Sequence, residues 1–274
     1  MIIALDGPLL LVGAGKMGGA MLAGWLGRGL DPRRIIAVDP APPDEIKPLL
    51  RTHGIRLEAA APKLDRPPSV ILMAVKPQVM DTVFPPLAKL AGPATVVISI
   101  AAGRTIASFE RHLASGIAVI RTMPNTPAAI GRGITVGTGN RHAGKAARDV
   151  CEMLLSAVGE VGWVDDEALI DAVTAVSGSG PAYVFLLAEC LAAAGVEAGL
   201  EPALAMRLAR VTVSGSGELL RQSDLDAATL RKNVTSPGGT TAAALDVLMA
   251  KDGLQRLMTK AVLAAARRGR ELAG

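Results

Sequence analysis

An apolar run that leads directly into a glycine-rich turn leaves few folds open to this chain of 274 residues. Leu9–Val12 contains no polar residue, which is typical of a buried parallel strand. The segment Gly13-Ala14-Gly15-Lys16-Met17-Gly18 follows at once, and helical spacing continues over Gly19–Leu30. In such a turn the first glycine allows a sharp bend, the second lets a pyrophosphate approach the backbone, and the third lets the helix pack against the strand. The spacing therefore predicts a dinucleotide site, with a tight turn that binds nothing as the alternative.

Strand-like runs and helical patterns alternate as far as residue 166. The expected strands are Leu9–Val12, Arg34–Val38, Ile55–Leu57, Val70–Val75, Thr95–Ile100, Ile117–Met123, Gly133–Thr138 and Val161–Val164. Helices are expected between them, including one from about Asp44 and one over about Ala143–Ala157. This alternation predicts an α/β fold with a parallel sheet. Because ligands bind beyond the carboxyl ends of such strands, we expect the segments that follow the strands to share one edge of the sheet.

The pattern changes after Asp165-Asp166, beyond which only helical periodicity remains. The expected helices are Pro181–Gly195, Pro202–Leu220, Asp224–Lys232, Thr241–Met249 and Gly253–Leu272. The sequence thus predicts a Rossmann-type dinucleotide-binding domain over residues 1–166 and an all-helical domain over residues 167–274. Because the helical part is apolar and rich in alanine, we expect it to bury one face against a second copy of itself.

Composition narrows the classes of function. The net charge is only +4 and aromatic residues make up 2% of the chain, so the basic stripe with interleaved aromatics of a nucleic-acid-binding protein is missing. Cys151 and Cys190 stand in apolar helical patterns and are expected to be reduced and buried. The three histidines are isolated, so no metal is expected. The most apolar stretch, Val184–Ala194, is interrupted by Glu189 and is too short to cross a bilayer. We expect a soluble cytoplasmic protein that binds neither nucleic acid nor membrane.

Three polar segments follow predicted strands. Asp39 closes the second strand, where an acidic residue meets the adenosine ribose, and its charge would repel a 2′-phosphate. It therefore favours NADH, unless Asp39 is a loop residue turned to solvent. Lys76-Pro77 offers a cation and a fixed turn beside the cofactor, or only a solvated charge and a first-turn proline. The amide of Asn125 offers hydrogen bonds to the nicotinamide or its ribose, with a simple Asx turn as the alternative.

Two further segments carry glycine and hydroxyl groups in the helical part. Ser236-Pro237-Gly238-Gly239-Thr240-Thr241 stands where a helix begins, and a helix start with unpaired N–H groups attracts a small anion. The alternative is a loop in which Thr240 caps the helix. Ser177–Tyr183 does not match the nucleophile elbow of serine hydrolases, and its small residues leave room for a ring. A cofactor site together with a carboxylate site predicts hydride transfer to a small carboxylate.

These segments, taken together, resemble the pyrroline-5-carboxylate reductase family. The resemblance covers nearly the whole chain, from Leu10 to about Leu272. The matching segments are Val12–Gly18, Ala74–Gln78, Ser99–Gly103, Arg121–Pro127, Ser177–Tyr183 and Asn233–Thr241. The first is shared by many dehydrogenases, whereas the last two together are specific to this family.

The resemblance implies a fold, an assembly and a reaction. It implies an N-terminal Rossmann domain and a helical dimerisation domain that intertwines with its partner's, in dimers that often assemble into decamers. It implies an active site between the cofactor domain of one subunit and the helical domain of its partner. The implied reaction is the reduction of 1-pyrroline-5-carboxylate to L-proline by NAD(P)H, the last step of proline biosynthesis.

The resemblance also implies roles for single residues. Backbone N–H groups of Gly239 and Thr240 would hold the substrate carboxylate, and Val234 would line the ring pocket. The hydroxyl of Thr241 would bond the carboxylate or the ring nitrogen and help to deliver a proton. The residues implied in cofactor binding are Gly13, Ala14, Gly15, Lys16, Met17, Gly18, Asp39, Ala74, Lys76, Pro77, Ala101, Ala102 and Asn125. Asp39-Pro40 departs from the Ser, Asn or Arg that many family members place there, so NADH is favoured while NADPH stays open.

Three other functions compete with this one. A β-hydroxyacid dehydrogenase shares the layout but needs a catalytic lysine, and the region Ser177–Leu200 contains none. A reductase of another cyclic imine fits almost as well. A dinucleotide-binding sensor without turnover predicts a damaged substrate segment, whereas Ser236–Thr241 is intact.

Overall fold

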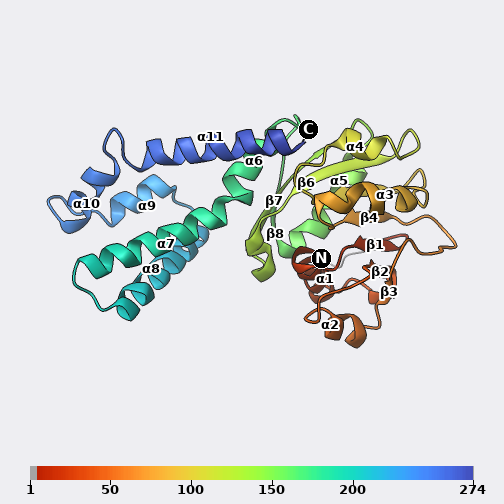
Figure 1. Cartoon of the computed structure of the whole chain (residues 1–274), viewed down its shortest axis with the longest axis horizontal. Coiled ribbons are helices and arrows are strands. Elements are labelled where there is room, and N and C mark those ends of the chain that lie inside the picture. The colour runs from red at the N-terminus through yellow and green to blue at the C-terminus, as the bar shows by residue number, and fades with distance from the viewer. Residues whose placement is uncertain (1–4, 274) are drawn as a thin grey trace. The chain divides into compact units, whose positions relative to one another are not determined.

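The computed structural model describes residues 5–273, with the side chain of residue 273 excepted (Figure 1). The chain divides into two compact units, which are described separately below. Unit 1 comprises Met1–Gly178 and Ala265–Gly274, and unit 2 comprises Ser179–Ala264.

Unit 1 is built on one sheet with the order β3-β2-β1-β4-β5-β6-β7-β8. The strands are β1 Leu9–Val12, β2 Ile35–Val38, β3 Arg56–Glu58, β4 Val70–Met73, β5 Val96–Ser99, β6 Ala118–Met123, β7 Gly133–Gly139 and β8 Gly159–Trp163. The strands from β1 to β6 are parallel, as the sequence predicts. β7 is antiparallel to β6 and β8 is parallel to β7, so the last two strands run the other way. A parallel crossover needs a dozen or more residues, and residues 124–132 are too few to provide one.

Helices cover both faces of the sheet in unit 1. The α-helices are α1 Lys16–Gly27, α2 Lys47–Thr52, α3 Met80–Ala88, α4 Ile106–Glu110, α5 Lys145–Leu155 and α6 Leu169–Val173. The short 3₁₀ turns are η1 Pro32–Arg34, η2 Pro77–Val79, η3 Thr126–Ile130 and η4 Ser156–Val158, and η5 Thr174–Gly178 is a π-helix. α1 begins inside the glycine-rich segment, which places the start of the helix directly at the turn.

The alternation of side chains along β1 explains its unbroken apolar run. Leu9 and Leu11 belong to one buried cluster, whereas Leu10 and Val12 belong to the other. The first cluster includes side chains of α1 and α5, and the second includes side chains of α3 and α4. A strand that is buried on both faces must be apolar at every position, because successive side chains point to opposite faces.

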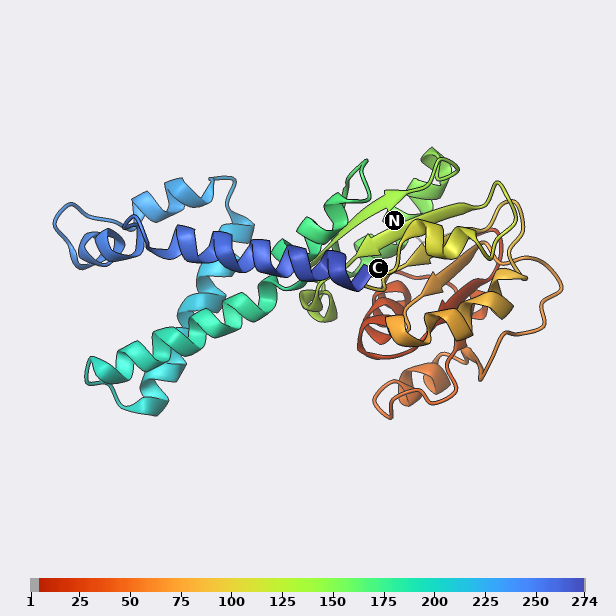
Figure 2. The same ribbon diagram turned by 45° about the horizontal axis from the view of Figure 1, so that its top comes forward.

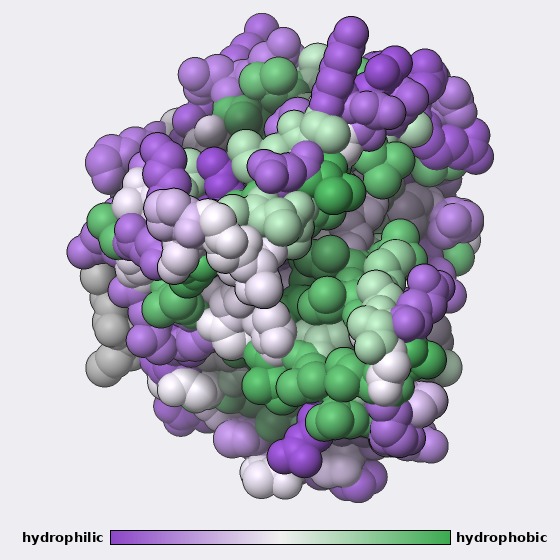
Figure 3. Space-filling model, turned by 90° about the vertical axis from the view of Figure 1, so that its left-hand side faces the viewer, coloured by the Kyte–Doolittle hydropathy of each residue, from purple (hydrophilic) through white to green (hydrophobic). Residues whose placement is uncertain are grey.

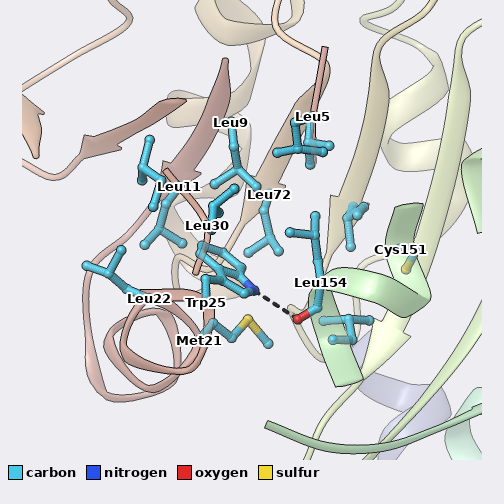
Figure 4. Packing of buried hydrophobic residues seen from close by; sticks show 14 of the residues in the cluster. Leu5, Leu9, Leu11, Met21, Leu22, Trp25, Leu30, Leu72, Cys151 and Leu154 are labelled. Carbon is cyan, nitrogen blue, oxygen red and sulfur yellow. Dashed lines mark hydrogen bonds between the residues drawn. The ribbon is translucent and has the colours of Figure 1, made fainter. Parts of the chain in front are cut away.

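Trp25 joins α1 to α5 in the first cluster. Its ring is fully buried, and its Nε1–H donates a hydrogen bond of 2.8 Å to the carbonyl oxygen of Leu154 (Figure 4). The indole therefore combines a large buried surface with the partner that its N–H requires. Leu154 and Cys151, also on α5, are fully buried too, and burial raises the pKa of the Cys151 thiol well above its ordinary value. The expectation that both cysteines are buried is wrong for Cys190, which is exposed in the single chain.

Unit 2 consists of helices alone. They are α7 Gly180–Glu197, α8 Pro202–Gln222, α9 Ala227–Asn233 and α10 Thr240–Leu248, and α11 Leu254–Ala273 begins in unit 2. α7 and α8 pack side by side (Figure 2), and small residues line their contact. Ala192, Ala205 and Ala209 are buried there, and a Cβ on Gly195 would lie 3.3 Å from that of Ala205.

Many large apolar side chains of unit 2 remain exposed in the single chain. Phe185 on α7 is 63% exposed, Val211 on α8 is 64% exposed and Leu257 on α11 is 63% exposed. Figure 3 shows apolar side chains gathered in one area of the face that it displays. Soluble monomers rarely expose large apolar patches, so such surfaces mark a contact with another molecule.

Among the residues that the structure describes, one helical stretch is long and apolar enough to span a membrane. This stretch is Leu169–Glu197, judged by its length and composition alone. The shorter run Val184–Ala194 within it is not long enough by itself. Only 6% of its most apolar window is buried within the chain. A helix that packs against a partner has the same composition, so this single stretch is weak evidence for a membrane.

The buried hydrogen bond between Trp25 and Leu154 leads to a prediction about stability. Trp25→Phe removes a buried donor, leaves the Leu154 carbonyl without its partner and opens a small cavity. We expect the free energy of unfolding to fall by about 2 kcal/mol. Urea denaturation followed by circular dichroism measures this change without relying on tryptophan fluorescence.

The control is Trp163→Phe. Trp163 is only partly buried, and its Nε1–H reaches Glu152 at 3.3 Å on the surface. We expect a loss below about 1 kcal/mol for this variant. Equal losses for the two variants would show that the buried hydrogen bond contributes nothing particular to the fold.

Candidate cofactor and substrate sites

Two of the three fingerprint glycines are required by the fold of unit 1 itself. Gly13 has φ +94°, and its N–H donates to the carbonyl of Val38. A Cβ on Gly13 would lie 2.7 Å from the carbonyl oxygen of Ala74. A Cβ on Gly18 would lie 2.1 Å from the carbonyl oxygen of Gly13, closer than atoms can approach. These glycines let β1, β4 and α1 meet, with or without a ligand.

Gly15 differs from the other two because neither its conformation nor its packing requires glycine. Its φ is −69°, and no heavy atom of the described residues lies within 4 Å of a Cβ built on it, its chain neighbours apart. It is the N-cap of α1, and none of the described side chains caps this helix start. The space above Gly15 is therefore open to a ligand, and the free N–H groups of the first turn favour an anion such as a pyrophosphate.

A hollow of about 660 Å³ adjoins this turn. It is lined by Gly13, Gly15, Val38, Asp39, Pro40, Ala41, Pro43, Ala59, Ala60, Ala61, Ala74, Val75, Lys76, Val79, Thr82, Val83, Pro86 and Leu87. Small and apolar side chains predominate, which suits a flat ring such as adenine. Within this lining, the charged side chains are Asp39 and Lys76.

Asp39 is fixed in the wall of the hollow rather than turned to solvent. Its Oδ2 accepts a hydrogen bond of 2.8 Å from the N–H of Ala14, and its Oδ1 accepts one of 2.9 Å from the N–H of Ala41. Its own N–H continues the ladder between β2 and β3 by donating to Glu58. The carboxylate thus joins the glycine turn to the segment after β2, a connection that sequence spacing alone did not reveal.

The other expected cofactor residues lie at the same edge of the sheet or at the start of α1. Lys16, Met17 and Gly18 form the first turn of α1, and the side chain of Lys16 is exposed. Lys76 is exposed and precedes η2, in which Pro77 is the first residue. β1, β2 and β4 are parallel, so the segments that follow them meet at one edge.

Ala101, Ala102 and Asn125 lie outside the lining of the hollow. Ala101 is buried just after β5 and donates its N–H to the Ser99 hydroxyl, whereas Ala102 is exposed. The Oδ1 of Asn125 accepts a hydrogen bond of 3.0 Å from the N–H of Ile134, which braces the connection between β6 and β7. This bond is not an Asx turn, and it leaves the NH₂ of Asn125 as the group that can donate to a ligand.

Sequence reasoning missed two walls of the hollow. One is the alanine run Ala59–Ala61, which follows β3. The other is the face of η2 and α3 that carries Val79, Thr82, Val83 and Pro86. These four residues are spaced three and four apart, which indicates one face of a helix. The sequence alone did not show what that face adjoins.

In unit 2, the expected substrate residues lie around the connection between α9 and α10. Gly239, not Thr240, is the N-cap of α10, and Thr240 is the first helical residue. The N–H of Gly239 donates to the carbonyl of Ser236 at 3.0 Å, and none of the described side chains caps the helix. Gly238 has φ +69°, a conformation that favours glycine. Val234 is the C-cap residue of α9 and is 64% exposed.

Ser177–Tyr183 forms a helix entry rather than a nucleophile site. Ser177 closes on its own helix by donating to the carbonyl of Val173, and α7 begins at Gly180 with Pro181 in its first turn. In the described part of the chain, no group of three His, Cys, Asp or Glu side chains is placed to hold a metal ion. Unit 1 thus offers the open helix start at Gly15 and the fixed carboxylate of Asp39, and unit 2 offers the helix start at Thr240.

Comparison with known proteins places these features in a family. Residues 167–272 match a family model described as pyrroline-5-carboxylate reductase dimerisation, and residues 9–103 match one described as NADP oxidoreductase, coenzyme F420-dependent. A pyrroline-5-carboxylate reductase from Synechocystis is 41% identical over 96% of this chain and 97% of its own length. The solved structure of a pyrroline-5-carboxylate reductase from Coxiella burnetii has a TM-score of 0.91 and 32% identity, and the match covers 98% of this chain and 100% of that one. The structure of a Plasmodium falciparum pyrroline carboxylate reductase with NADP bound has a TM-score of 0.80 and 27% identity over 98% of this chain and 99% of that one. The chain thus belongs to the pyrroline-5-carboxylate reductase family.

Proposed function

We propose that this protein reduces 1-pyrroline-5-carboxylate to L-proline with a nicotinamide dinucleotide, as the last step of proline biosynthesis. The observation that carries the proposal is the uncapped helix start at Gly239 and Thr240, in a chain that resembles reductases of this name over nearly its full length. The open space above Gly15 supports the cofactor half of the proposal. When bound, the reduced nicotinamide supplies a hydride.

The residues of unit 1 hold and orient the cofactor in this proposal. The first-turn N–H groups of α1 bind the pyrophosphate beside Gly15, with Lys16 next to it in the chain and Lys76 in the lining of the same hollow. The adenine lies against Ala59–Ala61 and the α3 face, and Asp39 accepts from the ribose hydroxyls. Ala101, Ala102 and the NH₂ of Asn125 flank the nicotinamide end.

The residues of unit 2 hold the substrate. The N–H groups at the start of α10 bind the carboxylate, as the positive end of a helix favours an anion. For Gly239 this requires a three-centre bond shared with the Ser236 carbonyl or release from it. Val234 lines the ring, and the Thr241 hydroxyl bonds the carboxylate or the ring nitrogen and helps to deliver the proton. Because an iminium is electrophilic by itself, positioning supplies most of the catalysis.

A second copy of the chain completes the enzyme in this proposal. The exposed apolar side chains of α7, α8 and α11 supply a surface for dimerisation, and the dimerisation family model covers this region from residue 167. We propose that the functional boundary falls between residues 166 and 167, that dimers assemble into a decamer, and that each active site uses both subunits. The apolar stretch Leu169–Glu197 then serves the dimer of a cytoplasmic enzyme rather than a membrane span.

The substrate site can be tested by turnover. Purified protein should oxidise NADH when given 1-pyrroline-5-carboxylate and release proline. Thr241→Ala should lower kcat about 10- to 100-fold, since it removes the hydroxyl next to the reacting nitrogen. Gly239→Val should raise KM for the imine by crowding the carboxylate, and both variants should still bind NADH.

The matched control for the hydroxyl is Thr259→Ala on α11, where the hydroxyl donates to the Gln255 carbonyl. This variant should turn over like the parent. Turnover that survives both site substitutions would place the substrate elsewhere. A folded parent that binds NADH but does not reduce this imine would point to another cyclic imine or to a sensor.

The cofactor site can be tested with a pair of glycine variants. Gly15→Ala fills the space above the turn without meeting any neighbour, so the fold should persist while the dissociation constant for NADH rises about tenfold or more. Gly27→Ala, at the exposed end of the same helix, also meets no atom within 4 Å and should leave NADH affinity unchanged. Calorimetric titration measures both. Unchanged NADH affinity in Gly15→Ala would contradict the assignment.

The preference for NADH can be tested at Asp39. We expect kcat/KM with NADH to exceed that with NADPH by about tenfold, because the fixed carboxylate repels a 2′-phosphate. Asp39→Asn removes this charge and should bring the ratio close to one, and Asp44→Asn, at a surface carboxylate paired with Lys47, should leave it unchanged. A parent that prefers NADPH would show that Asp39 does not discriminate.

A further inference from the structure

The connection after β5, residues 100–105, is weakly held by its own backbone. Ala102 is exposed and Gly103 has φ +69°. Among the described residues, the hydrogen bonds that tie residues 102–104 to another element come from the side chain of Arg104. The N–H of Ile100 donates to the Met73 carbonyl on β4 and Ala101 is buried, so the start of this connection is held by the sheet. The guanidinium group of Arg104 supplies the hydrogen bonds that hold residues 102–104 against α3.

Arg104 forms a bidentate ion pair with Asp81, which lies in the first turn of α3. Its Nη1 donates to Asp81 Oδ2 at 3.0 Å, and its Nη2 donates to Asp81 Oδ1. The side chain of Arg104 is 18% exposed, whereas that of Asp81 is 56% exposed. Arg111, the C-cap residue of α4, also reaches Asp81 Oδ1, at 2.9 Å, from a more exposed position. The Arg104 hydrogen bonds are the main cause that lowers the pKa of Asp81 below its ordinary value, so the pair is charged at neutral pH.

Asp81 lies on a different side of α3 from the residues that line the hollow. Val79, Thr82 and Val83 face the hollow, whereas Asp81 does not belong to its lining. The ion pair therefore joins the helix that forms one wall of the hollow to the connection that carries Ala101 and Ala102.

We propose that Arg104 is a positioning residue that fixes the connection after β5 against α3 and thereby orients the nicotinamide end of the cofactor. The inference rests on the proposed placement of Ala101 and Ala102 beside that end. A bidentate guanidinium defines both distance and angle, which a single ammonium does not.

Stability is a modest reason for this arginine. Solvent screens the pair because Asp81 is half exposed, although the bidentate geometry and the third charge of Arg111 make it stronger than an isolated surface pair. The Nε of Arg104 is buried and, within the described residues, has no hydrogen-bond partner, which is unfavourable. A side chain that carries such a local cost is typical of a position that serves function.

The experiment compares the binding of NADH with that of ADP-ribose, which lacks the nicotinamide. In Arg104→Ala we expect the dissociation constant for NADH to rise about tenfold and that for ADP-ribose to change less than about twofold. Arg104→Lys should restore only part of the NADH affinity. Arg111→Ala, which removes an equal charge from the same carboxylate, should leave both ligands unaffected. The melting temperature of each variant reports folding.

Each outcome decides between alternatives. Equal weakening of NADH and ADP-ribose, or no weakening of either, would overturn the inference, and so would an equal effect of Arg111→Ala. The binding readout does not depend on the imine. A parent that fails to reduce 1-pyrroline-5-carboxylate while the NADH-specific loss persists would refute the proposed reaction and leave the role of Arg104 standing.

Discussion

The contact between Gly18 and the carbonyl of Gly13 governs the architecture of unit 1. A Cβ on Gly18 would lie 2.1 Å from the carbonyl oxygen of Gly13, so only a hydrogen atom fits there. As a result, α1 can start directly at the end of β1. This close approach brings Met21, Leu22 and Trp25 onto the sheet and points the free N–H groups of the helix at the open space beside Gly15. Core packing and ligand binding thus follow from one steric fit.

Sequence reasoning recovered the central strands β1, β2, β4 and β5 because each is a short, almost wholly apolar run. It did not predict the reversal of β7 and β8, since the signal lies in the length of the 124–132 connection rather than in its residue types. It located Asp39 but not the partners of its carboxylate, Ala14 and Ala41, which are backbone groups and leave no mark on a side-chain pattern. The alanine wall of the hollow was missed for a similar reason, because small residues are ambiguous until their neighbours are known.

In unit 2 the sequence predicted the bounds of the helices to within a few residues but not which of their side chains are buried. Periodicity identifies an apolar face without identifying what covers it. Within one chain, small residues such as Ala205 and Ala209 are buried at the α7–α8 contact while Phe185 stays exposed. The π-helix at Thr174–Gly178 also lay outside what periodicity reveals, as it depends on one extra residue per turn.

The two backbone groups held by Asp39 have a consequence for how such an enzyme changes over evolutionary time. The carboxylate that we propose to discriminate between reductants also braces the glycine turn, so neutral drift at this position is restricted. A lineage that came to depend on a phosphorylated coenzyme would need a substitute acceptor for the Ala14 N–H before or together with the loss of the acid. A clear preference for the phosphorylated coenzyme is therefore expected to need paired replacements, because a single loss of charge only brings the two cofactors close to parity.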